Sequence, residues 1–258
     1  MRAKDFLLED LETEGKPGVT NLAVVFGGRF QPPTKGHFAV YSWLVRHFGK
    51  NVFIATSDKT DKAALEKYAE LQKAYENRYK VWLEKKAKAE AKGNKIPPEP
   101  KPPVAPKVKS YFDFAEKKQI WKTLFGIPSN KIIFSATPAF APKELLNTMP
   151  EQTAYVAVTS EKDKDRYASS PYFEPYPEEG GSPKRFDEVK NELYGFKTKG
   201  YYLVLPNLEG GISATEIRSI FQDPNKSEED KKSEFTRFYS KFNQEIFDLI
   251  NNRLSGNW

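Results

Sequence analysis

Hydrophobic and polar positions near the start of the chain follow the pattern of a β-α-β unit. Asn21–Phe26 (NLAVVF) is a short apolar run bounded by glycine, which is typical of a buried parallel strand, and Asn51–Thr56 (NVFIAT) is a second. Between them, Gly36–Phe48 repeats apolar side chains at helical spacing and stops at Gly49, a suitable C-cap. The crossover from strand through helix to strand is expected to be right-handed.

The same alternation returns in the second half of the chain. Further strands are predicted at Lys131–Ser135, Ala154–Thr159 and Tyr201–Leu205, and helices at Phe112–Phe125 and Lys143–Met149. Glu161–Gly181 is polar and rich in proline and glycine, and loops of that length are often functional. Five short strands alternating with helices predict an α/β fold with a Rossmann-like, doubly wound parallel sheet.

The C-terminal stretch has the clearest amphipathic pattern. Its apolar stripe predicts a single C-terminal helix, whose start Ser227 and Asp230 can cap. The stripe consists of Phe235, Phe238, Tyr239, Phe242, Ile246, Leu249 and Ile250.

One segment interrupts the α/β alternation. Thr60–Lys92 predicts one long helix with a stripe of aromatic and apolar side chains, and six prolines follow between Pro97 and Pro106. That composition predicts an extended, polyproline-like connector, so residues 59–109 form an insertion made of a helical arm and a return strap. The stripe is formed by Leu65, Tyr68, Tyr75, Tyr79 and Trp82.

Two interpretations of this arm stay open. Its stripe can pack on the body of the protein or on a second subunit, which would make the chain part of a homo-oligomer or a larger assembly. Alternatively, interleaved Tyr, Trp and Lys can hold single-stranded nucleic acid by stacking and charge, the less favoured interpretation. The predicted organisation is then an N-terminal arm (1–20), an α/β domain (21–58 and 110–222), the insertion (59–109) and a C-terminal helical segment (223–258).

Charge is concentrated in the insertion. The chain has 41 Lys and Arg against 35 Asp and Glu, and residues 59–109 contain 14 of the basic and 7 of the acidic side chains. The rest of the protein is therefore almost neutral, and a basic block of this kind is usually a solvated face.

Composition excludes several classes of protein. The chain has no cysteine, so disulfides and thiolate metal sites are excluded. No apolar run approaches the roughly 20 residues that a membrane-spanning helix needs, and the acidic N-terminal stretch does not fit a signal peptide. A cytoplasmic protein without membrane partners is the expectation.

Candidate chemistry is found in the loop after the first strand, residues 27–37 (GGRFQPPTKGH). Gly27 and Gly28 let the backbone approach a phosphate, and Pro32 and Pro33 hold the loop in one shape. Gly36 and His37 open a helix whose free N–H groups favour an anion. The imidazole of His37 and the hydroxyl of Thr34 can each donate a hydrogen bond to phosphate. The loop matches neither a Walker motif nor a G-x-G-x-x-G motif, and a rigid turn with a capping histidine is the structural alternative.

A second helix start follows the last predicted strand. Ser213 and Glu216 have capping-box spacing in ISATEIR, residues 212–218. Thr215 and Arg218 fall near the first turn, where Arg218 can grip a polyphosphate, although Ser213 can also be only a cap. Two helix N-termini are thus predicted at one edge of the sheet.

Together, GRFQPPTKGH and ISATEIR resemble the two signatures of the nucleotidylyltransferase superfamily, a G-x-F-x-P-x-[HT]-x-G-H loop and a late I-S-x-T-x-x-R helix start. GRFQP is most similar to the archaeal-type nicotinamide mononucleotide adenylyltransferases. The chain departs from them at Pro33-Thr34, where they have Phe-His; Thr at this place also occurs in pantetheine-phosphate adenylyltransferases. Class I aminoacyl-tRNA synthetases share the first signature, but no K-M-S-K-S element is present.

The resemblance implies roles for individual residues. His37, Thr34 and Arg218 would be catalytic, since they would contact the triphosphate and stabilise developing charge. The nucleotide-binding residues would be Gly27, Gly28, Arg29, Phe30, Gly36, Ser213 and Thr215. The acceptor attacks the α-phosphorus in line without a covalent intermediate, and Mg²⁺ arrives with the phosphates of the nucleoside triphosphate, with few or no protein ligands.

The resemblance also implies the reaction, with alternatives. ATP and nicotinamide mononucleotide are the first-choice substrates, which would place the enzyme in NAD biosynthesis. A cytidylyltransferase acting on a polyol phosphate or choline phosphate is the alternative within the class. A non-catalytic nucleotide-binding or structural protein that uses the basic arm for assembly is the alternative outside it.

Four further residues are weaker candidates. Lys164 and Arg166, in the loop after Ala154–Thr159, can reach phosphates or the acceptor, or can simply be solvated charges. Ser57 and Asp58, after the second strand, are candidate acceptor contacts. His47 receives no role.

Overall fold

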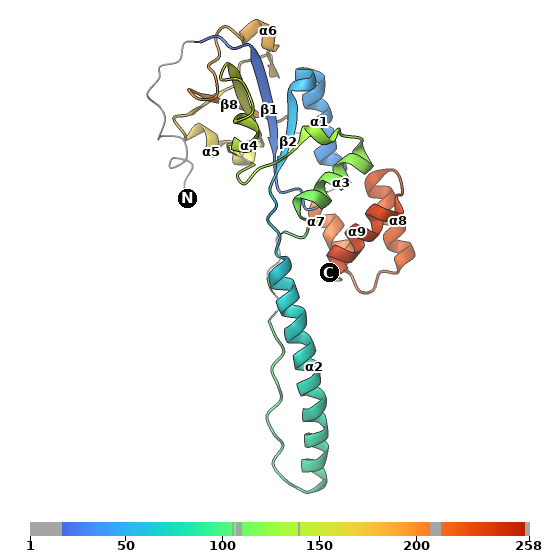
Figure 1. Ribbon diagram of the computed structural model, residues 1–258. Coiled ribbons are helices and arrows are strands. Elements are labelled where there is room, and N and C mark those ends of the chain that lie inside the picture. Colours follow the sequence, from blue (N-terminus) through green and yellow to red (C-terminus); the bar gives the residue numbers. More distant parts are fainter. Residues whose placement is uncertain (1–16, 105, 107–109, 139, 207–212, 256–258) are drawn as a thin grey trace.

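The computed structural model describes residues 17–104, 106, 110–138, 140–206 and 213–255. At its centre is a sheet of six parallel strands in the order β3-β2-β1-β4-β8-β5 (Figure 1). The strands are β1 (Asn21–Gly27), β2 (Val52–Thr56), β3 (Ile132–Phe134), β4 (Thr153–Thr159), β5 (Phe173–Pro175) and β8 (Gly200–Val204). The order reverses between β1 and β4, so the predicted Rossmann-like, doubly wound sheet is confirmed.

The sixth strand corrects the sequence prediction. β5 lies inside Glu161–Gly181, which was expected to be a loop, and pairs in parallel with β8 at the edge of the sheet. Pro175 is the last of its three residues and Pro171 lies two residues before it, and these prolines hid the strand in the sequence pattern. Close packing holds it in place: a Cβ on Gly200 would lie 2.5 Å from Cε1 of Tyr172 and 2.7 Å from Cε1 of Phe173.

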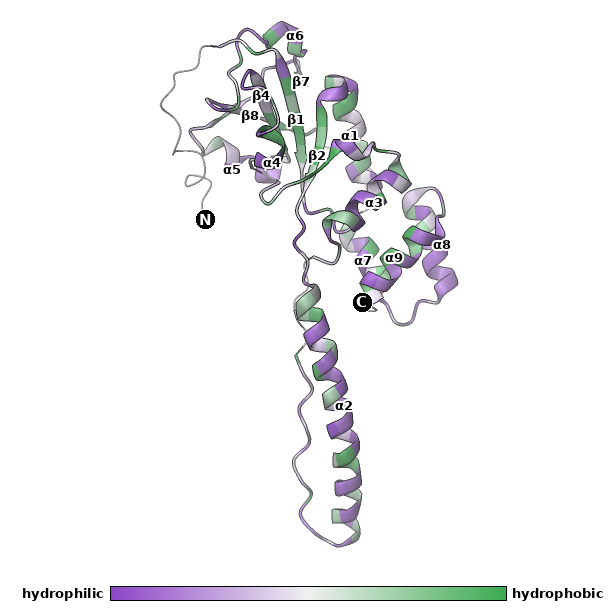
Figure 2. Cartoon of the chain, viewed as in Figure 1, coloured by the Kyte–Doolittle hydropathy of each residue, from purple (hydrophilic) through white to green (hydrophobic). Residues whose placement is uncertain are grey.

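Helices cover both faces of the sheet because side chains alternate along each strand. Val24 and Phe26 of β1 pack in one cluster with α1 (Lys35–Phe48), α3 (Phe114–Phe125) and α6 (Phe186–Val189). Val25, between them, packs on the opposite face with α4 (Lys143–Leu146) and α5 (Asp165–Ala168). Figure 2 shows the resulting concentration of hydrophobic residues along the strands.

The C-terminal region corrects a second prediction, because two helices replace the single expected one. α8 (Glu228–Tyr239) ends at Ser240, whose φ of 58° is left-handed, and α9 (Gln244–Ser255) follows. The apolar stripe continues across this break because both helices pack with α7 (Ala214–Gln222) and α3 around one core. The capping box of Ser227 and Asp230 at the start of α8 is confirmed. Short elements complete the chain: η2 (Gly49–Asn51), η3 (Ser129–Lys131), η4 (Glu161–Asp163), β6 (Glu178–Glu179) and β7 (Ser182–Pro183).

The insertion forms an arm that stands away from the sheet (Figure 1). Its helix, α2 (Lys62–Ala91), leaves the edge where β2 ends, and the strap returns alongside it. The less exposed positions of α2 repeat at intervals of three and four residues, and prolines on the strap are partly buried at every third residue, the period of a polyproline helix. The helix positions are 65, 68, 72, 75, 79, 82, 86 and 89, and the strap positions are 97, 100, 103 and 106.

The aromatic stripe of α2 therefore packs on the strap of its own arm, and the interpretation that it packs on the body is wrong. Trp82 is 9% exposed, and its Nε1 donates to the carbonyl of Pro97 at 2.9 Å. At the base, Asp61 N donates to the carbonyl of Ser110 at 2.8 Å, and Ser110 N donates to Oδ2 of Asp61 at 3.0 Å. None of the helices in the described part of the chain is long and apolar enough to cross a membrane.

Candidate active site

A cavity of about 220 Å³ lies at the carboxyl edge of the sheet, between the ends of β1 and β4. This is the point where the strand order reverses, the usual ligand position in a doubly wound sheet. The loop after β1 contributes Gly27, Gly28, Arg29 and Phe30, and α1 contributes His37. From the far side the cavity is lined by Val158, Thr159, Ser160, Asp163, Arg166 and Tyr167.

The loop after β1 folds so that the ring of Phe30 occupies the space beside Gly28. Phe30 has a φ of 45° and turns its ring back, 4% exposed, over Gly28. A Cβ on Gly28 would lie 2.8 Å from Cζ of Phe30, too close for any other residue without a shift of the ring. Gly28 N continues the sheet by donating to the carbonyl of Ala55 at 3.0 Å. The glycine expected to make room for a phosphate therefore also makes room for Phe30.

Thr34 and His37 form a reciprocal cap at the start of α1. Thr34 N donates to Nδ1 of His37 at 3.1 Å, and His37 N donates to Oγ1 of Thr34 at 3.3 Å. Nδ1 of His37 also lies 3.0 Å from Oγ1 of Thr34. The structural alternative, a capping histidine, is thus present, yet His37 also lines the cavity.

The surroundings of His37 fix its charge and its tautomer. The ring of Phe30 meets the imidazole edge to face, with centroids 5.0 Å apart, and Trp121 lies beyond at 6.4 Å. Burial lowers the pKa of His37 to about 4, so the ring is neutral near pH 7. Because Nδ1 accepts from the Thr34 amide, the ring proton is on Nε2. His37 therefore has one N–H donor available to a ligand.

Three contacts from distant segments hold the backbone of the loop. Oε1 of Gln31 accepts from the amides of Tyr111 and Phe112, both at 2.8 Å, and Nε2 donates to the carbonyl of Phe112 at 3.0 Å. The carbonyl of Gln31 accepts from Nη1 of Arg218 at 2.6 Å. The carbonyl of Pro33 accepts from the hydroxyl of Tyr239 at 3.0 Å. We call these contacts of Gln31, Arg218 and Tyr239 the loop clamp.

Sequence reasoning missed two members of the clamp. Gln31 belongs to the GRFQPPTKGH motif and Tyr239 to the C-terminal apolar stripe, and the sequence pattern predicts a site role for neither. A buried tyrosine in such a stripe needs a partner for its hydroxyl, and that requirement is the signal that could have singled out Tyr239.

The predicted helix start at residues 212–218 lies beside this loop. α7 begins at Ala214, and Ser213 Oγ accepts from the amide of Glu216 at 3.1 Å. Nη2 of Arg218 donates to Oγ1 of Thr215 at 2.8 Å. Ser213 and Thr215 are exposed on the first turn, while Ile212 lies outside the described residues. The structure thus brings Arg218 to the loop and leaves Ser213 and Thr215 open to solvent.

The four weaker candidates separate into three places. Arg166 lines the cavity with His37 and pairs with Oδ1 of Asp163 at 3.3 Å. Lys164 instead lines a neighbouring cavity of about 610 Å³, together with Trp43, Tyr176 and Tyr202. Leu205 is common to the linings of both cavities.

Ser57 and Asp58 occupy a third place, where they hold α3. The carbonyl of Ser57 accepts from Nζ of Lys117, a fully buried lysine, and Oδ1 of Asp58 accepts from the amide of Phe114 at 2.8 Å. Burial lowers the pKa of Lys117 to about 8 against the opposing effect of Asp58, Asp113 and Glu116. Neither Ser57 nor Asp58 lines the two cavities.

Comparison with known families gave one match. Residues 25–98 match the model of the cytidylyltransferase-like family. The cytidylyltransferase-like match contains the last three residues of β1, the loop, α1, β2 and α2, and it stops before α7. This match supports an assignment to the nucleotidyltransferase superfamily and an enzyme activity of that kind. Comparisons with curated proteins and with solved structures gave no significant match.

Proposed function

We propose that the protein is a nucleotidyltransferase that transfers a nucleoside monophosphate from a nucleoside triphosphate to a small phosphorylated acceptor and releases pyrophosphate. One observation carries the proposal: a neutral His37 with its proton on Nε2, at the N-terminus of α1, lines a cavity at the switch point of the sheet. This histidine also falls within the cytidylyltransferase-like match.

The chain has groups suited to each part of the reaction. Nε2–H of His37 donates to an oxygen of the α-phosphate, and the free amides at the start of α1 add their partial positive charge. An oxygen of the acceptor phosphate attacks the α-phosphorus from the opposite side, and the bond to the β-phosphate oxygen breaks as pyrophosphate leaves. Arg218, with Ser213 and Thr215 beside it, is the group we assign to the departing phosphates.

Thr34 receives a different role from the one that the resemblance implied. The residue is 2% exposed, and both its amide and its hydroxyl contact His37. We therefore assign Thr34 to orienting His37, with direct contact to the triphosphate left to His37 and the loop amides.

Magnesium fits this site as an ion delivered on the triphosphate. The first cavity offers one carboxylate, Asp163, which already pairs with Arg166. Within the described residues, no three His, Asp or Glu side chains cluster as a metal site. Such a donor set suits Mg²⁺ that keeps its waters and its phosphate ligands, and the ion would neutralise phosphate charge when bound. With the ion bound, Asp163 would accept a hydrogen bond from one of those waters.

The neighbouring cavity is the place that we assign to the ring of a second substrate. Trp43, Tyr176 and Tyr202 give it aromatic walls. Its charged lining consists of Lys164, which pairs with Oε1 of Glu161 at 3.4 Å, and of Glu161 and Glu178, so a phosphate bound here would take Lys164 from that pair. ATP with nicotinamide mononucleotide is our first choice of substrates because of GRFQP, and this choice includes a cytoplasmic role in NAD biosynthesis. The name of the matched family favours a second candidate, CTP with a polyol phosphate or choline phosphate.

A pyrophosphate-release screen tests the proposal. Purified protein with Mg²⁺ is offered ATP or CTP, each with nicotinamide mononucleotide, a polyol phosphate or choline phosphate. We expect release with one pair and not with the triphosphate alone. Release with ATP and nicotinamide mononucleotide selects the adenylyltransferase, and release with CTP selects the cytidylyltransferase. If no pair releases pyrophosphate while ATP or CTP still binds, the non-catalytic alternative replaces the enzyme.

A further inference from the structure

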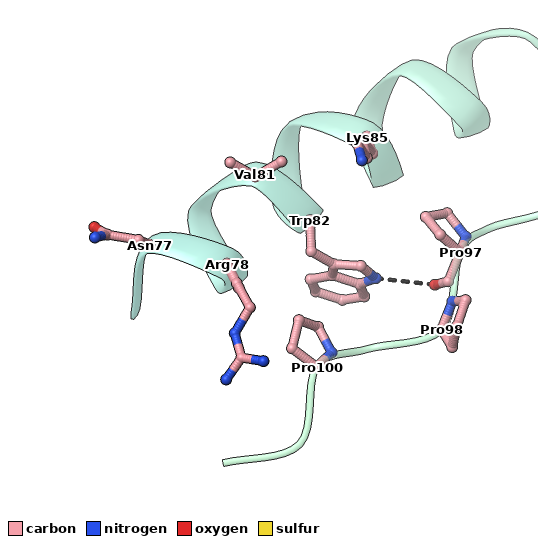
Figure 3. A pocket seen from close by; sticks show the side chains of 8 residues that line it. All are labelled: Asn77, Arg78, Val81, Trp82, Lys85, Pro97, Pro98 and Pro100. Atoms are coloured by element: carbon pink, nitrogen blue, oxygen red, sulfur yellow. Dashed lines mark hydrogen bonds between the residues drawn. The ribbon is translucent and has the colours of Figure 1, made fainter. Parts of the chain in front are cut away.

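A groove in the outer half of the arm has no role in the proposed reaction. Its volume is about 500 Å³, and it lies between α2 and the strap. Figure 3 shows Trp82 pointing from the helix to the strap, with Pro97, Pro98 and Pro100 around its ring. Val81, which is 49% exposed, lies between Arg78 and Lys85 on the helix side. We call this the distal groove; Asn77 completes its lining.

Basic side chains are concentrated in the half of the arm that contains this groove, and Arg78 and Lys85 line the groove itself. Residues 77–101 contain eight basic and three acidic side chains, whereas residues 59–76 contain four of each. The outer half of the arm is therefore strongly positive around an apolar floor, and the inner half is balanced. A partner for the distal groove must be acidic and must also carry apolar side chains.

Single-stranded nucleic acid fits this surface poorly. Binding of that kind uses exposed aromatic faces on which bases stack. Trp82 is covered by prolines and by Lys86, whose Nζ lies 5.2 Å from the centre of its ring. Tyr79 lies beside Trp82 and Tyr75 beside Tyr79, with tilted rings whose centroids are 5.3 and 5.7 Å apart, and both tyrosines are partly buried. The ring of Trp82 is thus already used to hold the strap, and the rings of Tyr75 and Tyr79 are in contact with their neighbours on the helix.

The chain itself contains a segment with the required chemistry. Residues 5–14 (DFLLEDLETE) have five acidic side chains and no basic one, and they carry Phe6, Leu7, Leu8 and Leu11. The net charge of this acidic segment is opposite and equal to that of residues 77–101. We propose that the distal groove binds residues 5–14 of a second copy of this chain.

The reach of the chain requires a second copy. The described chain starts at Pro17, at the amino edge of the sheet, while α2 leaves the carboxyl edge. β1 spans about 23 Å between these edges, and α2 adds about 30 Å from its start to Trp82. The twelve residues from Asp5 to Pro17 reach about 42 Å at full extension, which is too short within one molecule.

Charge reversal in the full chain tests this contact. The variant R78E/K85E reverses the groove, and D10K/E12K reverses the acidic segment. Sedimentation velocity should show the unmodified chain self-associating, and each variant doing so at least tenfold more weakly. An equimolar mixture of the two variants should recover the association, because the reversed charges are again complementary. K67E/K73E, which changes two exposed lysines of the inner arm, is the matched control and should behave like the unmodified chain.

A second measurement uses a defined probe. A labelled synthetic peptide of residues 1–16 should bind the D10K/E12K chain in fluorescence anisotropy and bind R78E/K85E at least tenfold more weakly. An unmodified chain that stays monomeric, or a peptide that binds both proteins equally, overturns the proposal. An association that nuclease abolishes assigns the arm to nucleic acid and also overturns it. Circular dichroism checks that each variant keeps its fold.

Discussion

At the scale of single residues, the site depends on how His37 is buried. The chain has only two histidines, and they lie in opposite environments at the two ends of α1. Phe30 and Trp121 pack around His37 and keep it neutral, and the Thr34 amide sets its tautomer. His47 is exposed, with Nδ1 2.8 Å from the carbonyl of Trp43. The chain therefore supplies its own matched control.

Replacement of His37 should remove a donor used in the transition state. We expect His37→Ala to lower kcat by about 10²–10³, the cost of losing one well-placed donor. His47→Ala should leave kcat unchanged. Pyrophosphate release under saturating substrate measures both variants. If circular dichroism shows both proteins folded, equal activity of His37→Ala and the unmodified protein would contradict a role of His37 as a hydrogen-bond donor in the transition state.

The pKa of His37 also predicts how stability depends on pH. Its folded pKa of about 4 is below the value of 6.5 for an unfolded chain, so the unfolded state binds more protons between these values. The free energy of unfolding should fall as the pH drops from about 6.5 to 4, by up to about 3 kcal/mol from this group. Urea unfolding at several pH values measures this slope. His37→Gln should have a shallower slope, and an unchanged slope would contradict the burial of the ring.

At the scale of elements, the loop after β1 is held by contacts that come from far along the chain. Arg218 reaches its backbone from α7, Tyr239 from α8, and residues 111 and 112 pack against Gln31 from the end of the insertion. The C-terminal helices therefore help to position the phosphate-binding loop while they build their own core.

Loss of the Tyr239 hydroxyl should loosen the loop. In Tyr239→Phe the carbonyl of Pro33 stays buried without its donor, which should lower the free energy of unfolding by about 1–2 kcal/mol. kcat should fall as well, because His37 follows Pro33 closely in the chain. Chemical denaturation and pyrophosphate release measure the two effects. Tyr68→Phe, on the arm, makes the same chemical change away from the loop, and equal losses in both variants would refute a specific role for Tyr239.

Periodicity in the sequence predicted elements well where one face packs on a large core. β1, α1, β2 and β4 agree with their apolar runs to within one or two residues. β5 escaped prediction because three residues, the last of them a proline, carry too little pattern. The sequence predicts one helix where the structure has α8 and α9. The spacing of apolar residues indicates which side chains are buried, but it does not show that the backbone changes direction at Ser240.

For the candidate site, too, the sequence predicts some features and not others. The loop after β1 and the start of α7 lie at one edge of the sheet, as the sequence predicts, because the loops that follow parallel strands lie at the same edge. The loop clamp could not be predicted from the sequence. Gln31 and Tyr239 bind partners that are far away along the chain, and a single sequence does not show which distant residues come into contact. Ser57 and Asp58 also follow a strand, but they hold α3 and line neither of the two cavities described above.

At the scale of the whole molecule, the protein is an α/β body with an attached arm. The arm begins and ends at one point, where Asp61 and Ser110 share two hydrogen bonds. Its aromatic side chains pack on its own strap, so the body needs none of them for its core.

Removal of the arm should therefore spare the body. We expect a chain in which a short Gly-Ser linker replaces residues 62–109 to keep its melting temperature within a few degrees and to retain kcat. Differential scanning calorimetry and pyrophosphate release test this. Aggregation or loss of kcat on removal would show that the arm supports the catalytic body directly.

The junction of Asp61 and Ser110 also bears on the order of folding. β2 and β3 are neighbours in the sheet, yet the whole insertion separates them along the chain. A disordered stretch of that length would add loop-closure entropy to their pairing, which slows folding. α2 forms through local contacts, and its strap folds back to bring the ends of the arm together. Early formation of the arm would shorten the effective loop and allow the nucleus of the sheet to assemble as if the insertion were small.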